Sequence, residues 1–133
     1  YYRFMDTLRE LTQTMLVRFT QIDYDREMAL VAVTTDENGK ETQIGVARYV
    51  GNPDGESVEF ALAVGDDWQK CGVGRKLMTA LIDCARVKGY RAVVGDVLST
   101  NSKMFRLMTS LGFTIHPHPE DTAVKRVVRP LTN

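Results

Sequence analysis

The chain has 133 residues, of which 44% are hydrophobic and 26% are charged, and its formal net charge is zero. This apolar content is sufficient for one domain with a buried core and argues against a disordered chain. The balanced charge gives no reason to expect a nucleic-acid partner or a membrane surface, and no apolar run is long enough to span a bilayer.

The start of the sequence and its two cysteines indicate the origin of the domain and the compartment that it suits. The sequence begins Tyr1-Tyr2-Arg3-Phe4 rather than with Met, so we interpret residues 1–133 as one domain from the C-terminal part of a longer protein. Cys71 and Cys84 are too few for a disulfide framework and suit a reducing compartment. We therefore expect a cytoplasmic protein.

The first half of the chain predicts a helix followed by strands. Thr7 and Glu10 fit a capping box, and apolar residues at positions 8, 11, 15 and 19 continue a helical stripe. Apolar and β-branched runs then predict strands at 28–35, 43–50 and 57–64. Segments rich in Asn, Gly and Pro separate these runs and predict tight turns at 37–40 and 52–55.

The second half alternates helices with strands. The spacing of apolar residues predicts a helix over 73–88 that ends at Gly89, and a buried strand over 92–97. A short helix follows Asn101, and a last strand is expected at 124–128. The order of these elements predicts one α/β unit. We interpret His116-Pro117-His118 as a loop, and we expect no metal because no other Cys or His has ligand spacing.

The most informative segment is Gln69-Lys70-Cys71-Gly72-Val73-Gly74, which joins a strand to a helix. Glycine has no Cβ, so the backbone can approach a ligand closely. The first N–H groups of a helix have no internal partner and carry the positive end of its dipole. Such a loop favours a phosphate or pyrophosphate, and the basic residues nearby, Arg75 and Lys76, add to this preference.

Three motifs compete for this loop. A Walker A motif needs Gly-x4-Gly-Lys-Ser/Thr, which does not occur in the sequence. A dinucleotide-binding motif needs a third glycine where Leu77 stands, although Asp96 lies at a suitable distance downstream, so this alternative is weakened and remains open. The third motif, Gln-x-x-Gly-x-Gly, is the acyl-CoA pyrophosphate loop of the GNAT acetyltransferases.

A second segment, from Asn101 to Phe113, supports the third motif. Apolar residues at 104, 107, 108 and 111 mark one helix face, Asn101 can cap its start, and Gly112 can end it in a left-handed conformation. An Asn that opens a short helix ending in Leu-Gly-Phe resembles the second cofactor-binding segment of the GNAT superfamily. The resemblance covers about residues 23–131.

The resemblance implies a GNAT acyl-CoA N-acyltransferase fold, in which helices flank a mixed central sheet and splayed central strands hold coenzyme A. The implied cosubstrate is acetyl-CoA, with its pyrophosphate on the loop, its pantetheine arm on the backbone of the preceding strand, and Lys103 or Arg106 near its adenosine phosphates. The implied cofactor-binding residues are Ala63, Val64, Gln69, Lys70, Cys71, Gly72, Val73, Gly74, Arg75, Asn101, Phe105 and Arg106.

Glu59 is the candidate catalytic residue. Strand alternation places it with Ala61 and Ala63, two small residues that leave room for a substrate. A lysine amine has a pKa of about 10.4, so a base must remove its proton before it attacks a thioester near neutral pH. The alternative is an ordinary surface glutamate. Many GNAT members carry a Tyr general acid where this chain has Met108, so the proton donor to the leaving thiolate stays open.

The acceptor is suggested by residues 19–28, which resemble the same segment of bacterial protein lysine acetyltransferases, enzymes that modify acetyl-CoA synthetase. The resemblance implies a protein lysine acetyltransferase with acetyl-CoA synthetase as its partner. An acidic patch at Asp23, Asp25 and Glu27 could attract a lysine-bearing surface, although the charges alone favour a solvated turn. The alternatives are a small-molecule amine acetyltransferase and a module that senses acyl-CoA without turnover.

Overall fold

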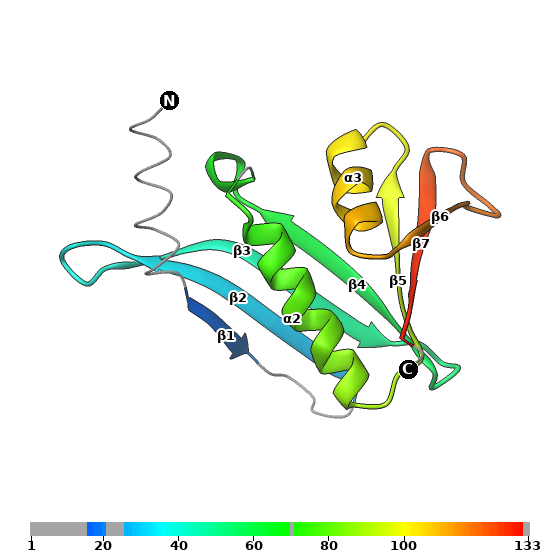
Figure 1. Cartoon of the computed structure of the whole chain (residues 1–133), viewed down its shortest axis with the longest axis horizontal. Helices are drawn as coiled ribbons and strands as arrows, with labels where there is room; N and C mark the ends of the chain where they lie inside the picture. The colour runs from blue at the N-terminus through cyan, green and yellow to red at the C-terminus, as the bar shows by residue number, and fades with distance from the viewer. Residues whose placement is uncertain (1–15, 21–25, 70, 132–133) are drawn as a thin grey trace.

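The computed structural model describes residues 16–20, 26–69 and 71–131 (Figure 1). In these residues, one mixed sheet has the strand order β1-β2-β3-β4-β5-β7-β6. The strands are β1 Leu16–Thr20, β2 Glu27–Thr35, β3 Glu41–Gly51, β4 Ser57–Val64, β5 Ala92–Leu98, β6 Thr114–Pro117 and β7 Val124–Pro130. The helices are the short 3-10 helix η1 Asp66–Trp68 and the α-helices α2 Val73–Val87 and α3 Ser102–Ser110.

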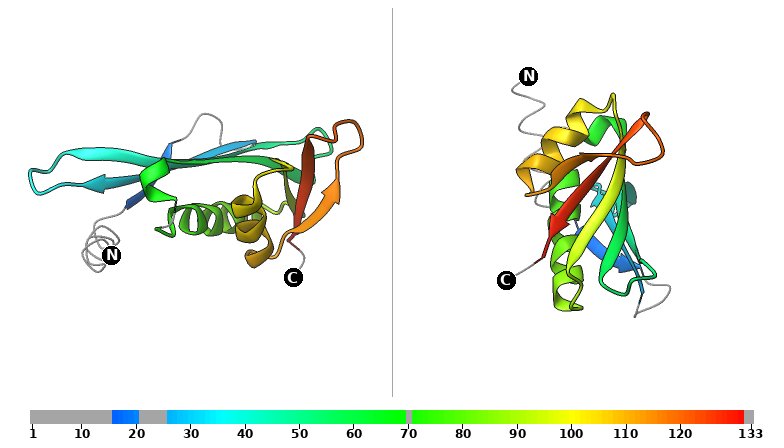
Figure 2. Two further views of the ribbon diagram at one scale, coloured as in Figure 1. Left: turned by 90° about the horizontal axis from the view of Figure 1, so that it is seen from above. Right: turned by 90° about the vertical axis from the view of Figure 1, so that its right-hand side faces the viewer.

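Helices α2 and α3 lie on one face of the sheet (Figure 2). The buried side of α2 carries apolar residues three and four positions apart, which is the spacing of a single helical face. Leu77 and Leu81 are fully buried there and pack with β2 and β3 residues such as Leu30 and Ala47. The core therefore lies between α2 and the antiparallel strands β2, β3 and β4.

The sheet splits between β4 and β5, its parallel pair of neighbouring strands. Their register covers Ser57↔Ala92, Val58↔Val93 and Glu59↔Val94 and goes no further. Strand β4 nevertheless continues to Val64, and β5 continues to Leu98. The two strands diverge from this short contact (Figure 1), so the expected splay of the central strands is confirmed. We call the space between residues 60–64 of β4 and β5 the split.

Phe60 and Gly95 pack at the closed end of the split. A Cβ on Gly95 would lie 2.4 Å from Cε1 of Phe60, which no real pair of carbon atoms tolerates. The Phe60 ring also meets Phe113 edge to face, with the ring centroids 5.5 Å apart. Phe113 follows α3 directly, so this cluster links the start of the split to the end of that helix.

Most of the predicted elements are confirmed, with bounds that differ by one or two residues. Strand 57–64 is observed as expected, and helix α2 ends one residue before the predicted position, with Lys88 as its cap. Gly89 and Gly112 both adopt the positive φ angles that end the two helices. The predicted capping box at Thr7 and Glu10 lies outside the described residues.

Two expectations about local structure are wrong. Phe19 was expected on a helix, but residues 16–20 form strand β1, which pairs with β2 in the register Phe19↔Leu30. Pairing satisfies the backbone of the β2 edge, and at Phe19 this tertiary gain outweighs the local helical spacing. Positions 8, 11 and 15 of the predicted stripe lie outside the described residues. His116 was expected in a loop, but it lies in β6 and pairs with Arg126 of β7. All four β6 side chains are exposed, so no apolar alternation signals this strand.

Candidate functional site

A groove of about 490 Å³ runs along the split and under the start of α2. Its volume lies in the range typical of sites for small molecules and cofactors. It is lined by β4, the loop before α2, α2 itself and the start of α3, through Leu62, Ala63, Val64, Gln69, Gly72, Gly74, Arg75, Asn101, Lys103, Met104 and Leu107. Elements far apart in the sequence therefore meet around one elongated space.

The N-terminus of α2 opens into this groove. Gly72 is its N-cap residue, with a left-handed conformation at φ 77° and ψ 9°, and Gly72 provides no side chain to cap the helix. No acidic residue stands in the first turn. The first N–H groups of α2 and the positive end of its dipole are therefore available to an anion in the groove.

Gly72 gives a direct test of this anion site. A Cβ at Gly72 would meet no protein atom within 4 Å, so it would project into open space beside the helix N-terminus. We expect Gly72→Ala to weaken coenzyme A binding on the order of tenfold, which corresponds to about 1.4 kcal/mol. The left-handed backbone adds a folding cost of about 1–2 kcal/mol.

Gly89→Ala is the matched control for this substitution. Gly89 follows the other end of α2, has φ 89°, and its Cβ would likewise meet no atom within 4 Å. Both variants should lose similar stability in thermal unfolding, but calorimetric titration with coenzyme A should show weaker binding for Gly72→Ala alone. Equal affinity of the two variants for coenzyme A would contradict an anion site at Gly72.

Side-chain hydrogen bonds of Arg75 and Gln69 connect the start of α2 and the loop before it to neighbouring elements. Nη2 of Arg75 donates to Oγ of Ser110 at 2.5 Å, which ties α2 to α3 and holds the guanidinium at the rim of the groove. Nε2 of Gln69 donates to the carbonyl of Val64 and to Oδ1 of Asp66, each at 3.3 Å. The Gln69 side chain thus connects the loop to the end of β4.

The edge of β4 provides backbone groups for a ligand. Ala63 and Val64 pair with Val46 and Gly45 of β3 on one side. No strand in the described ranges pairs with residues 60–64 on the other side. Because the N–H and C=O groups of a strand point alternately to its two sides, half of those of residues 60–64 point into the split. A ligand with amide groups can pair with this edge as a strand would.

Helix α3 forms the opposite wall. Oδ1 of Asn101 accepts a hydrogen bond from the N–H of Met104 at 3.2 Å, so the expected capping role is confirmed. This bond leaves the side-chain NH₂ group of Asn101 for another partner. Met104 and Leu107 give the groove an apolar surface, and Lys103 adds a positive charge.

The structure brings seven of the expected cofactor-binding residues together in the groove: Ala63, Val64, Gln69, Gly72, Gly74, Arg75 and Asn101. Cys71, Val73, Phe105 and Arg106 do not line it, and Lys70 lies outside the described residues. Leu62, Met104 and Leu107 also line the groove, although they were not among the expected site residues. The signal for the last two was the apolar stripe of α3, which contains both.

The four expected residues that do not line the groove have other surroundings. Val73 is buried in the core. Burial raises the pKa of the Cys71 thiol, and its sulfur lies 3.9 Å from the carbonyl oxygen of Asp67, so it is a poor nucleophile near neutral pH. Phe105 is half-buried with Nζ of Lys125 5.9 Å from its ring centroid, and Arg106 is exposed.

Glu59 lies at the closed end of the split. It is the last β4 residue in register with β5, and its side chain is 48% exposed. It does not line the groove. It lines a neighbouring hollow of about 370 Å³ with Arg48, Val50, Phe60, Ala61 and Asp96. The carboxylate therefore stands where the two central strands begin to separate. Met108, by contrast, is fully buried, and its thioether has no proton to donate.

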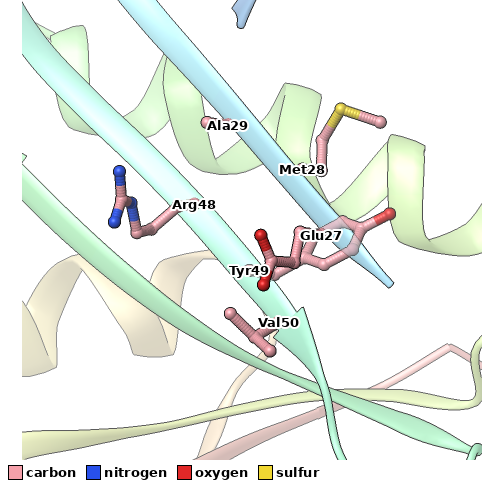
Figure 3. A pocket seen from close by; sticks show the side chains of 6 residues that line it. All are labelled: Glu27, Met28, Ala29, Arg48, Tyr49 and Val50. Carbon is pink, nitrogen blue, oxygen red and sulfur yellow. The ribbon is translucent and has the colours of Figure 1, made fainter. Parts of the chain in front are cut away.

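A smaller hollow of about 90 Å³ adjoins the one at Glu59 and shares Arg48 and Val50 with it. Figure 3 shows its lining residues on β2 and β3, with Glu27 at the start of β2. Asp23 and Asp25 of the expected acidic patch lie outside the described residues. Tyr49 is buried here beside Tyr90, and burial raises the pKa of the Tyr49 phenol to about 12, so it is a neutral packing group.

Two further properties concern the described residues alone. Across residues 16–20, 26–69 and 71–131, no three His, Cys, Asp or Glu side chains come together in a group that could hold a metal ion. Among the helices described, none has the length and hydropathy needed to cross a membrane.

Residues 2–113 match the family model described as the acetyltransferase (GNAT) family. The chain is 32% identical over 122 residues to acetyltransferase PA5475 of Pseudomonas aeruginosa, an alignment that covers 92% of this chain and 65% of that protein. The chain thus spans less than two thirds of the length of this relative.

Two solved structures share the fold. The GNAT domain of PAT from S. lividans superposes with a TM-score of 0.70 at 26% identity, covering 86% of this chain and 66% of that one. YncA from Salmonella typhimurium, solved with its cofactor acetyl-CoA, superposes with a TM-score of 0.65 at 28% identity, covering 80% of this chain and 66% of that one. The mixed sheet with its splayed central strands is therefore the GNAT acyl-CoA N-acyltransferase fold.

Proposed function

Because the chain belongs to the GNAT family of acetyltransferases, we propose that it transfers an acetyl group from acetyl-CoA to a lysine amine of a target protein. The observation that carries this proposal is the groove itself, which combines an uncapped helix N-terminus, a free strand edge and an apolar wall. Coenzyme A presents the matching groups: a pyrophosphate, followed by a pantetheine arm that contains two amide groups and apolar alkyl segments. We assign this activity to the cytoplasm, a reducing compartment that suits the two free cysteines Cys71 and Cys84.

The coenzyme contacts follow from the groove lining. The pyrophosphate would bind the N–H groups at Gly72 and Gly74, with Arg75 at the rim. The pantetheine amides would pair with the β4 edge at Ala63 and Val64 and meet the free NH₂ group of Asn101. Met104 and Leu107 replace Phe105 as the apolar cover, because they line the groove and Phe105 does not.

Acetyl transfer then needs no enzyme nucleophile. The amine nitrogen attacks the thioester carbonyl, a C–N bond forms, and the C–S bond breaks. Glu59 accepts the amine proton, directly or through one water molecule. The leaving thiolate has a pKa near that of Cys, about 8.5, so it can depart as the anion and take its proton from solvent, since Met108 has none to give.

Three observations support a protein lysine as the acceptor. The fold is similar to the GNAT domain of PAT, and residues 19–28 resemble the protein lysine acetyltransferases that modify acetyl-CoA synthetase. In addition, the hollow at Glu59 carries two carboxylates, Glu59 and Asp96, on the sheet face away from α2. An amine that approaches from this face would meet the Glu59 carboxylate before it reaches the thioester.

The test is mass spectrometry of acetyl-CoA synthetase after incubation with acetyl-CoA and the folded chain. We expect acetylation of a lysine on the synthetase and little product from free amines such as polyamines and amino acids at equal concentration. Acetylation of a free amine alone would overturn the protein acceptor and leave acetyl transfer in place. Coenzyme A binding with no product from any amine would instead indicate an acyl-CoA sensor.

A further inference from the structure

Arg126 of β7 joins two carboxylates at the closed end of the split. Its Nη1 atom donates to Oδ1 of Asp96 at 3.0 Å and to Oε1 of Glu59 at 3.4 Å. Glu59 and Arg126 are separated by 67 positions in the sequence. The contact therefore exists only because the sheet brings β4, β5 and β7 side by side.

The register of the sheet explains how one side chain reaches both partners. Asp96 and Arg126 are directly paired on β5 and β7. Glu59 is paired with Val94, two residues before Asp96 on β5, and residues two apart share a face of the sheet. Arg126 thus extends over β5 to reach β4, across two strand spacings, or roughly 10 Å.

His118 lies on the other side of Asp96. Nδ1 of His118 accepts the N–H of Glu120 at 3.1 Å, so in the neutral ring the proton lies on Nε2. This Nε2 atom is 3.8 Å from Oδ2 of Asp96. Both oxygens of Asp96 therefore face protein partners, whereas Glu59 uses Oε1 for Arg126 and keeps Oε2 for another group.

From this asymmetry we propose that Arg126 is a positioning residue for Glu59, an inference that rests on the proposed acetyl transfer. Asp96 anchors the guanidinium at its shorter contact. The guanidinium in turn holds the Glu59 carboxylate at the closed end of the split, with Oε2 free to take the proton of the incoming amine. Of the two carboxylates in the hollow, Glu59 is thus the base and Asp96 the anchor.

If Arg126 had only a structural role, its loss would change the stability of the protein slightly and leave the rate of acetyl transfer unchanged. Ion pairs between partly exposed side chains stabilise a protein by about 0–1 kcal/mol. All three side chains are about one third to one half exposed. Loss of Arg126 should therefore leave the fold nearly unchanged, whereas a base that is misplaced by 1 Å can lose on the order of 100-fold in rate.

The experiment is a double-mutant cycle on acetyl transfer, with Glu59→Gln, Arg126→Met and the double variant. We expect Arg126→Met to lower kcat by about 10- to 100-fold with an unchanged KM for acetyl-CoA, because Arg126 does not line the groove. In the Glu59→Gln background it should cause no further loss, since Arg126 acts through Glu59. Arg126→Lys, which keeps the charge, should recover part of the rate.

Arg91→Met is the matched control. Arg91 also pairs with a glutamate of the neighbouring segment, Glu56, at 4.0 Å, but both side chains are exposed and lie before the split. This variant should keep the wild-type kcat. An Arg126→Met rate equal to wild type, or equal losses from Arg126→Met with and without Glu59, would overturn the positioning role. The wild-type rate, measured in the same experiment, separates the two proposals. A wild-type chain that transfers no acetyl group would overturn the proposed function itself, rather than only the positioning role of Arg126.

Discussion

Replacing Glu59 with glutamine should lower kcat for acetyl transfer by about 10²- to 10⁴-fold, the range typical for loss of a general base. The amide keeps the size and shape of the side chain but cannot accept a proton. Glu59 does not line the coenzyme groove, so the dissociation constant of acetyl-CoA should stay within about twofold of its wild-type value. Steady-state kinetics at saturating acetyl-CoA and calorimetric titration measure the two quantities separately.

Glu56→Gln is the control for this variant. Glu56 precedes β4 directly, is exposed, and pairs with Arg91 outside the split. It should retain full activity, which would show that the loss at Glu59 depends on position rather than on negative charge near β4. Full turnover by Glu59→Gln would remove Glu59 from the mechanism. The hollow contains one further carboxylate, Asp96, and Asp96→Asn would then be the next variant to assay.

The second large effect is expected on stability, from Gly95→Ala. The new methyl group would lie 2.4 Å from Cε1, 2.8 Å from Cδ1 and 2.9 Å from Cζ of Phe60. Phe60 is 8% exposed and its ring packs against Phe113, so it cannot move aside without displacing the end of α3. Overpacking of this kind costs about 1–3 kcal/mol, which should lower the Tm by on the order of 10 °C.

Thermal unfolding monitored by circular dichroism measures this loss. Phe60→Leu, combined with Gly95→Ala, is the informative second variant, because leucine has no counterpart of Cε1 and Cζ, two of the three atoms that clash. The double variant should unfold at a higher temperature than Gly95→Ala alone. An unchanged Tm for Gly95→Ala would mean that the Phe60 ring has room to move. The packing at the closed end of the split would then not require glycine at position 95.

The parts of the fold that were predictable from sequence are those with strong local signals. Strand β4 shows clear alternation, α2 combines a glycine start with an apolar stripe, and Asn101 has the residue type of a helix cap. Each of these signals arises from residues adjacent in sequence. The glycine loop before α2 and the capped α3 could be located for the same reason.

The features that escaped prediction depend on contacts distant in sequence. Strands β1 and β6 are edge strands defined by their partners β2 and β7. The choice of Met104 and Leu107 over Phe105 as groove residues depends on the rotation of α3 about its axis, which packing against the core sets. Likewise, no local pattern connects Arg126 to Glu59.

The short register between β4 and β5 has a thermodynamic consequence. Among the described residues, the strand pairing between β1–β4 on one side and β5, β7 and β6 on the other is limited to the register of residues 57–59 with 92–94. Bound coenzyme A would connect these two parts of the molecule. Its amides would hydrogen-bond to the open edge of β4, and its pantetheine arm would contact α3. Resistance to unfolding would then rise with the cellular acetyl-CoA level, by about 2.7 kcal/mol at a hundredfold excess over the dissociation constant.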